Sequence, residues 1–72
     1  MSIRPVWVIQ NKSSGLFLGN DLFLTRSLRD AGRCEDLEAA LDTAISSLET
    51  DFEIHMFYET EQVIERRFNN DI

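Results

Sequence analysis

The most unusual chemical feature of this 72-residue chain is a run of carboxylates without compensating cations. Residues 35–65 contain ten Asp and Glu residues and no Lys or Arg, whereas residues 1–34 carry a net charge of +3. Such a segment repels nucleic acid and attracts cationic protein surfaces. The competing interpretation is a solvated surface that only keeps the protein soluble. The predicted protein-binding residues are Glu35, Asp36, Glu38, Asp42, Glu49, Asp51 and Glu53.

The same acids do not predict an enzyme. Paired carboxylates act as general acid and base only where a pocket separates their pKa values, and a chain this short has little room for one. Cys34 and His55 are the only cysteine and histidine, too few for a structural zinc site, and the acids lack the spacing of a calcium-binding loop. We therefore expect no catalytic residue, no metal and no cofactor.

A second group of charged residues lies between residues 26 and 33. Arg26, Arg29 and Arg33 would share one face if this segment were a helical turn, but Gly32 interrupts it, so an irregular connection fits equally well. The arginines could bind phosphate groups or pair with the protein's own acidic helix, and pairing with the helix is the more economical interpretation. Because the net charge is −6, a nucleic-acid-binding role is the weakest hypothesis.

The acids must be positioned by a helix, which the sequence predicts over residues 35–49. Asp36 is the predicted N-cap, and Glu38 and Asp42 lie on the face opposite the apolar one, where like charges four residues apart repel. The apolar face repeats with the 3.6-residue period of a helix. Its members are Leu37, Ala40, Leu41, Ala44, Ile45 and Leu48.

The N-terminal third predicts a β-hairpin. Residues 4–10 are rich in β-branched and aromatic residues, with Pro5 acceptable only at the start of a strand. Residues 11–15 form a loop ending in glycine, and the apolar run that follows completes a hairpin over residues 4–19. Residues 22–25 are expected to add a short third strand.

After the helix, residues 52–59 alternate between apolar and polar types, as in a strand with one buried face. Phe57 breaks this alternation by placing an aromatic ring on the polar face. One helix covers one face of a sheet only, so this ring predicts contact with a second copy of the chain. Phe57 and Val63 are the residues expected to make that homodimer contact.

The C-terminal end is expected to add one more element. Residues 60–62 can make a tight connection, and residues 63–68 predict a final strand, with a helical turn as the alternative. Residues 69–72 are expected to fray.

Together these elements predict an α+β fold in one domain, residues 1–72. A small antiparallel sheet of order β-β-(β)-α-β-β is expected to carry one amphipathic helix on one face, packed through Leu37, Leu41, Ala44 and Leu48. The single cysteine excludes an internal disulfide, and the absence of a long apolar run predicts a soluble protein of the cytoplasm with no membrane contact.

Three segments resemble small accessory proteins of tailed bacteriophages, in which a hairpin precedes a capped helix. They are Trp7–Ile9, Ser14–Leu18, and Asp30–Ala31 running on to Asp36–Ala40. The resemblance implies an anti-defence protein that binds a host factor in the host cytoplasm, such as a nuclease or an RNA-guided complex with a cationic nucleic-acid-binding surface. The alternative is an assembly protein that acts as a homodimer.

Overall fold

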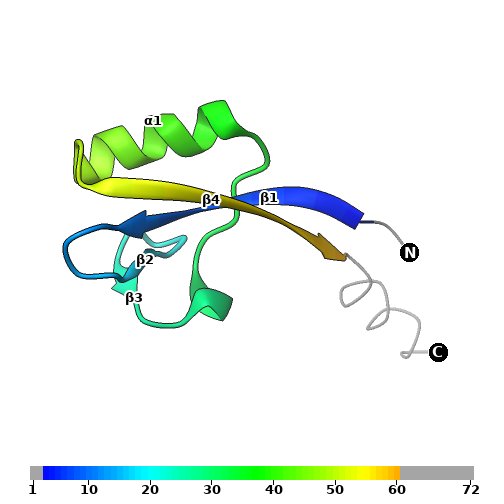
Figure 1. Cartoon of the computed structure of the whole chain (residues 1–72), viewed down its shortest axis with the longest axis horizontal. Helices are drawn as coiled ribbons and strands as arrows, with labels where there is room; N and C mark the ends of the chain where they lie inside the picture. Colours follow the sequence, from blue (N-terminus) through cyan, green and yellow to red (C-terminus); the bar gives the residue numbers. More distant parts are fainter. Residues whose placement is uncertain (1–2, 61–72) are drawn as a thin grey trace.

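The computed structural model describes residues 3–60 and has an α+β fold (Figure 1). Four strands form an antiparallel sheet in the order β3-β2-β1-β4, and one α-helix packs on it, which confirms the predicted fold class. The expected final strand at residues 63–68 and the expected frayed end lie outside the described residues. The elements are β1 (Ile3–Asn11), β2 (Phe17–Leu18), β3 (Leu24–Thr25), the 3-10 turn η1 (Leu28–Asp30), α1 (Leu37–Leu48) and β4 (Phe52–Thr60).

The central ladder joins the two long strands, β1 and β4. They pair over their full nine residues, from Ile3 opposite Thr60 to Asn11 opposite Phe52. The predicted hairpin between β1 and β2 is also present, but its ladder is short because β2 has only two residues. Gly15 closes this loop at φ +78°, a backbone conformation that favours glycine.

Pro5 lies at the third position of β1, not at its start, and the hydrogen-bond pattern explains why it is tolerated. Trp7 exchanges two backbone hydrogen bonds, of 3.1 and 2.9 Å, with Cys34 on the side of β1 away from β4. Backbone groups alternate in direction along an antiparallel strand, so Pro5, two residues earlier, faces the same way as Trp7. Its missing N–H therefore removes nothing from the β1–β4 ladder.

Helix α1 begins where the sequence indicates. The Asp36 side chain accepts a hydrogen bond of 2.7 Å from the backbone N–H of Ala39, which confirms the predicted N-cap. The helix ends at Leu48, and the C-cap residue Glu49 has φ +62°. No glycine is available here, so a charged residue adopts a conformation that L-residues disfavour.

The core on the helix side is built around two alanines. Ala40 and Ala44 are fully buried, so the helix approaches the sheet closely over β1 and β4, while larger residues are left beside the contact. The expectation that Leu37 and Leu41 pack on the strands is therefore wrong: they are 49% and 37% exposed. The remaining members of this core are Ile9 and Leu18, with Trp7, Cys34, Leu48, Phe52 and Ile54 partly buried against them.

The opposite face of the sheet is also covered, contrary to the expectation that one helix leaves it open. Val6 and Val8 point to this face and are only 1% and 0% exposed. Figure 1 shows α1 and η1 on opposite sides of the β1–β4 pair. The segment that contains η1 therefore acts as the second cover of the sheet.

This second cover, residues 27–34, combines both structures that the sequence left open. Ser27 caps η1 by accepting a hydrogen bond of 3.2 Å from the N–H of Arg29, and the chain then becomes extended. Gly32 donates a backbone hydrogen bond of 2.9 Å to Leu18, and a Cβ at this position would lie 2.7 Å from Oδ1 of Asn20. The glycine thus permits close packing of this segment on the sheet.

Candidate protein-interaction surface

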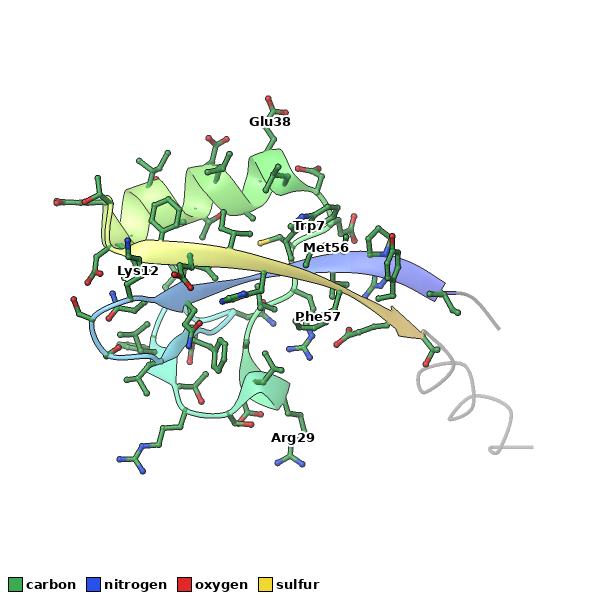
Figure 2. The ribbon with its side chains drawn as sticks, viewed as in Figure 1. Trp7, Lys12, Arg29, Glu38, Met56 and Phe57 are labelled. Atoms are coloured by element: carbon green, nitrogen blue, oxygen red, sulfur yellow. The ribbon has the colours of Figure 1, made fainter. Side chains whose placement is uncertain are left out.

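Three of the predicted protein-binding residues form one exposed row on α1, which we call the acidic row: Glu38, Asp42 and Glu49. Spacings of four and seven residues place them on one side of the helix. This side lies opposite Ala40 and Ala44, and Figure 2 shows Glu38 pointing away from the sheet. Within residues 3–60 no cation forms an ion pair with the row.

Glu35 extends the acidic row at its N-terminal end. Its side chain is 84% exposed, and its carboxylate lies 3.9 Å from a guanidinium nitrogen of Arg4. At this distance in solvent the pair contributes little to stability. Asp36, by contrast, is occupied by the N-cap and belongs to the fold.

Asp51 is also a structural residue, since it fastens the loop between β1 and β2. Its backbone and side-chain oxygens accept hydrogen bonds of 2.9 and 3.0 Å from the Asn11 amide, and its carboxylate accepts one of 3.2 Å from the N–H of Ser13. Hydrogen bonding from Ser13, followed by that from Asn11, holds the pKa of Asp51 below its usual value. The predicted binding role of this residue is not favoured by its position.

Glu53 lies on β4 next to a polar pair that joins the two long strands. His55 Nε2 lies 2.8 Å from Gln10 Oε1, and Gln10 Nε2 donates a hydrogen bond of 2.9 Å to the carbonyl of Gly15. The Gln10 amide nitrogen is thus oriented toward Gly15, so its oxygen faces His55 as an acceptor. Glu53 is 3.7 Å from the same imidazole nitrogen.

Arg33 makes the strongest charge pair among residues 3–60, and the sequence did not predict its partner. Its guanidinium donates two hydrogen bonds, of 3.0 and 2.7 Å, to one carboxylate oxygen of Glu59, and others of 2.8 and 2.6 Å to the carbonyls of Leu28 and Ala31. These bonds keep the pKa of Glu59 below its usual value, chiefly through Arg33. Arg33 therefore fastens the second cover to β4. The expectation that the arginines pair with the acidic helix is wrong for this residue, because its partner Glu59 lies on β4.

The other two arginines do not share this role. Arg26 and Arg29 are exposed, and Figure 2 shows Arg29 pointing away from the body of the protein. No ion pair joins either of them to another residue between 3 and 60. The three arginines therefore do not form one stripe.

Cys34 and His55 are held apart by the sheet. Cys34 packs against the core on the helix side, whereas His55 lines a hollow on the opposite face. Burial, followed by the nearby charge of Asp36, raises the pKa of the Cys34 thiol and so disfavours the reactive thiolate. In residues 3–60 no cluster of three or more His, Cys, Asp or Glu residues could hold a metal ion.

Phe57 is half-buried in this hollow, which has a volume of about 380 Å³. Phe57 lines the hollow together with Leu28 of the second cover and with Val8 and Phe17 of the sheet, so an aromatic residue on this face of β4 has apolar neighbours. The predicted partner residue Val63 is outside the described residues. The hollow is lined by Val8, Gln10, Phe17, Leu28, His55, Met56 and Phe57.

The main surface that the sequence did not predict is apolar. Leu37, Leu41 and Ile45, here called the apolar stripe, are 49%, 37% and 55% exposed along one side of α1. Met56 and Tyr58 on β4 are 46% and 66% exposed. The sequence contained a signal for this surface, because Ala40 and Ala44 are the only small residues of the predicted apolar face. The helix can approach the sheet closely only there, so the larger residues of that face lie beside the contact.

The part of the chain that the structure describes contains no helix long and apolar enough to cross a membrane. No protein-family model matches the sequence, and comparisons with curated proteins and with solved structures returned no significant match.

Proposed function

We propose that this protein is a non-enzymatic binding protein whose acidic row, Glu38, Asp42 and Glu49, docks on a cationic surface of another protein. The observation that carries the proposal is that the carboxylates of these acids make no ion pair within residues 3–60, whereas those of Asp36, Asp51 and Glu59 are bound by other parts of the protein. Like charges at Glu38 and Asp42 repel each other on the free helix. A cationic partner would relieve this repulsion.

The conformation of Glu49 supports the same proposal. Its φ of +62° costs about 1–2 kcal/mol for an L-residue and would cost glycine almost nothing. Strained residues are found preferentially at functional sites. We take the acidic side chain at this strained position as a contribution to binding that offsets its cost in stability.

Within this class we propose a host protein with a nucleic-acid-binding surface as the partner. Surfaces that bind phosphates gather Lys and Arg, and a helix that carries regularly spaced carboxylates competes for them. The resemblance of the hairpin and the capped helix to phage accessory proteins motivates the choice of a host factor. The proposal implies no direct contact with nucleic acid.

The experiment has two stages. Partners are first captured from host lysate with the wild-type protein and, in parallel, with the Glu38→Lys/Asp42→Lys/Glu49→Lys variant, and only proteins lost with the variant are kept. The affinity of the purified partner is then measured at several salt concentrations. We expect the triple variant to bind at least about 100-fold more weakly, with a smaller salt dependence for any remaining binding.

A matched control separates local charge from net charge. Asp30→Lys changes the net charge by the same amount as Asp42→Lys, but Asp30 lies in η1 on the other side of the sheet. We expect Asp42→Lys alone to weaken binding and Asp30→Lys to have little effect. Equal effects of both variants, or unchanged affinity of the triple variant, would contradict the proposal.

A further inference from the structure

The apolar stripe lies directly beside the acidic row on α1. Each residue turns the helix by about 100°. Starting from the buried alanines that contact the sheet, this rotation meets first the apolar stripe and then the acidic row. Leu41 follows Glu38 by three residues, and Ile45 follows Asp42 by three, so each apolar side chain has an acid as its direct neighbour. The outer surface of α1 therefore combines apolar and acidic groups in two parallel rows.

Exposed apolar residues of β4 lie on the same side of the molecule as the stripe. Thr43 lines a hollow together with Leu18 of β2, so the opposite flank of α1, which carries the stripe, faces β4. Met56 and Tyr58 alternate along β4 with the same period as Ile54, which belongs to the core under the helix. Both therefore lie on the helix side of the sheet and enlarge the exposed apolar surface there.

Charge disfavours two kinds of occupant for this surface. A nucleic acid would bring phosphates to the acidic row. A second copy of α1 would bring another acidic row, and the helix contains no Lys or Arg that could pair with it. The occupant must instead present cations beside apolar side chains, so that the acids are paired while the stripe is removed from water.

The spacing of the two rows fits another helix. Glu38 and Asp42 are four residues apart, which separates their Cβ atoms by about 5–6 Å, and Lys or Arg residues four apart on a second helix repeat at the same interval. On one face of a strand the repeat is longer, about 6.5–7 Å. The apolar stripe is itself a row of residues four apart, the kind of ridge that packs into the groove of a neighbouring helix.

Building on the proposed function, we propose that the partner contributes a basic amphipathic helix to this surface. Its apolar side covers the apolar stripe, and the Lys and Arg residues that border this side pair with the acidic row. Cations alone would satisfy the acids and leave Leu41 and Ile45 exposed to water. The two rows therefore act as one docking site, in which charge orients the helix and apolar burial adds affinity.

The first test uses a synthetic peptide of about 18 residues, a length sufficient for helix formation, with Leu along one side and Lys on both flanks. A permuted peptide of the same composition, in which Leu and Lys no longer occupy separate sides, is the control for charge alone. Binding of the labelled peptides to the full chain is measured by fluorescence anisotropy. We expect the amphipathic peptide to bind at least about 10-fold more tightly than the permuted one, which corresponds to the burial of one large apolar side chain. Equal affinities would overturn the proposal.

The second test removes the apolar stripe and keeps the charges. Glutamine has good helix propensity, so Leu41→Gln/Ile45→Gln changes the surface with little effect on α1. Phe23→Gln is the matched control, because Phe23 is 73% exposed in the loop between β2 and β3. We expect the double variant to bind the amphipathic peptide at least about 10-fold more weakly and the control to bind it as the wild type does. Ile45→Gln alone repeats the test if circular dichroism shows that the double variant is unfolded, and unchanged affinity of a folded variant contradicts the proposal.

The captured partner separates this proposal from the proposed function. If Glu38→Lys/Asp42→Lys/Glu49→Lys weakens its binding and Leu41→Gln/Ile45→Gln does not, the acidic row binds a cationic surface without the apolar stripe. The proposed function then stands, and the amphipathic helix is refuted. If neither variant weakens binding, both are refuted. Weakening by both variants is the result that we expect.

The chain itself is the other source of cations, since residues 61–72, outside the described part, contain Arg66 and Arg67. Arg66→Gln/Arg67→Gln tests this source, and Arg26→Gln/Arg29→Gln is the control that changes the net charge equally. We expect both variants to strengthen binding of the amphipathic peptide by the same small factor, through net charge alone. A gain at least about 10-fold larger for the first variant would show that the chain's own arginines occupy the acidic row. That result would overturn the proposal.

Discussion

The acidic segment contains two groups of acids: one is hydrogen-bonded within the fold, and the other faces solvent. Glu59 and Asp51 accept hydrogen bonds from Arg33 and from the loop between β1 and β2, and both have lowered pKa values. Glu38 and Asp42 face solvent on α1, and no cation between residues 3 and 60 forms an ion pair with them. The first group stabilises the fold, whereas the second is the group that we propose binds a partner.

This difference shows that local charge density does not define a binding surface. All these acids lie in a stretch without Lys or Arg, yet the cations that pair with Glu59 and adjoin Glu35 come from distant parts of the sequence. A carboxylate becomes structural when folding brings a donor to it. Substitutions in the first group should therefore lower stability more than binding, and substitutions in the second group should lower binding more than stability.

The largest effect is expected for Arg33→Ala, which removes the partner of Glu59 and the cation that holds the second cover on the sheet. Loss of these charged hydrogen bonds should lower the free energy of unfolding by about 2–3 kcal/mol, measured by urea denaturation. Arg33→Lys should recover only part of the loss, because an ammonium group cannot reproduce the planar set of donors. A loss of stability for Asp42→Ala as large as that for Arg33→Ala would contradict the distinction between acids that stabilise the fold and acids that only face solvent.

The pH dependence of stability is expected to come from the structural acids. Because folding lowers the pKa values of Glu59 and Asp51, their contribution is fully present above their unfolded pKa values of about 4 and is lost as the pH falls through the lowered folded values. In acid titrations followed by urea denaturation, Glu59→Gln/Asp51→Asn should flatten this loss. Glu38→Gln/Asp42→Asn/Glu49→Gln should keep it, and the reverse outcome would refute the assignment.

Glu49→Gly is expected to stabilise the protein by about 1 kcal/mol, because glycine adopts the positive φ of the helix C-cap without strain. The same variant removes one member of the acidic row and should weaken partner binding. Thermal unfolding and affinity are measured side by side, with Glu49→Gln as the control that removes the charge and keeps the strain. Destabilisation by glycine would show that contacts of the Glu49 side chain stabilise the fold by more than its positive φ costs.

The smallest effect on stability is expected for Asp42→Lys. It replaces a repulsive pair with an attractive one between Glu38 and Lys, four residues apart, and should stabilise the protein by about 0.3–0.5 kcal/mol. Its effect on binding should nevertheless be among the largest of any single substitution. Stability and affinity that fall together would mean that the acidic row belongs to the fold after all.

Much of the architecture could be predicted because it depends on short-range patterns. The period of α1, the Asp36 cap and the strand at residues 52–59 each involve residues close in sequence, and each is confirmed. The buried face that the alternation predicted is wrong for Met56 and Tyr58, which are 46% and 66% exposed. The second cover of the sheet could not be predicted, because it depends on Arg33 meeting Glu59 across 26 residues. For the same reason the sequence did not show that Leu28 of this second cover lies beside Phe57, and contact of Phe57 with a second copy stays a prediction.

By itself the sequence determined which segments form helix and strand and where negative charge is concentrated, because backbone propensity and charge are properties of nearby residues. Only the tertiary structure decided which acids are already paired and which apolar residues remain exposed. Ala40 and Ala44 set how closely the helix approaches the sheet, and this approach turned Leu37, Leu41 and Ile45 outward. Such outcomes depend on distances between segments that no local pattern encodes.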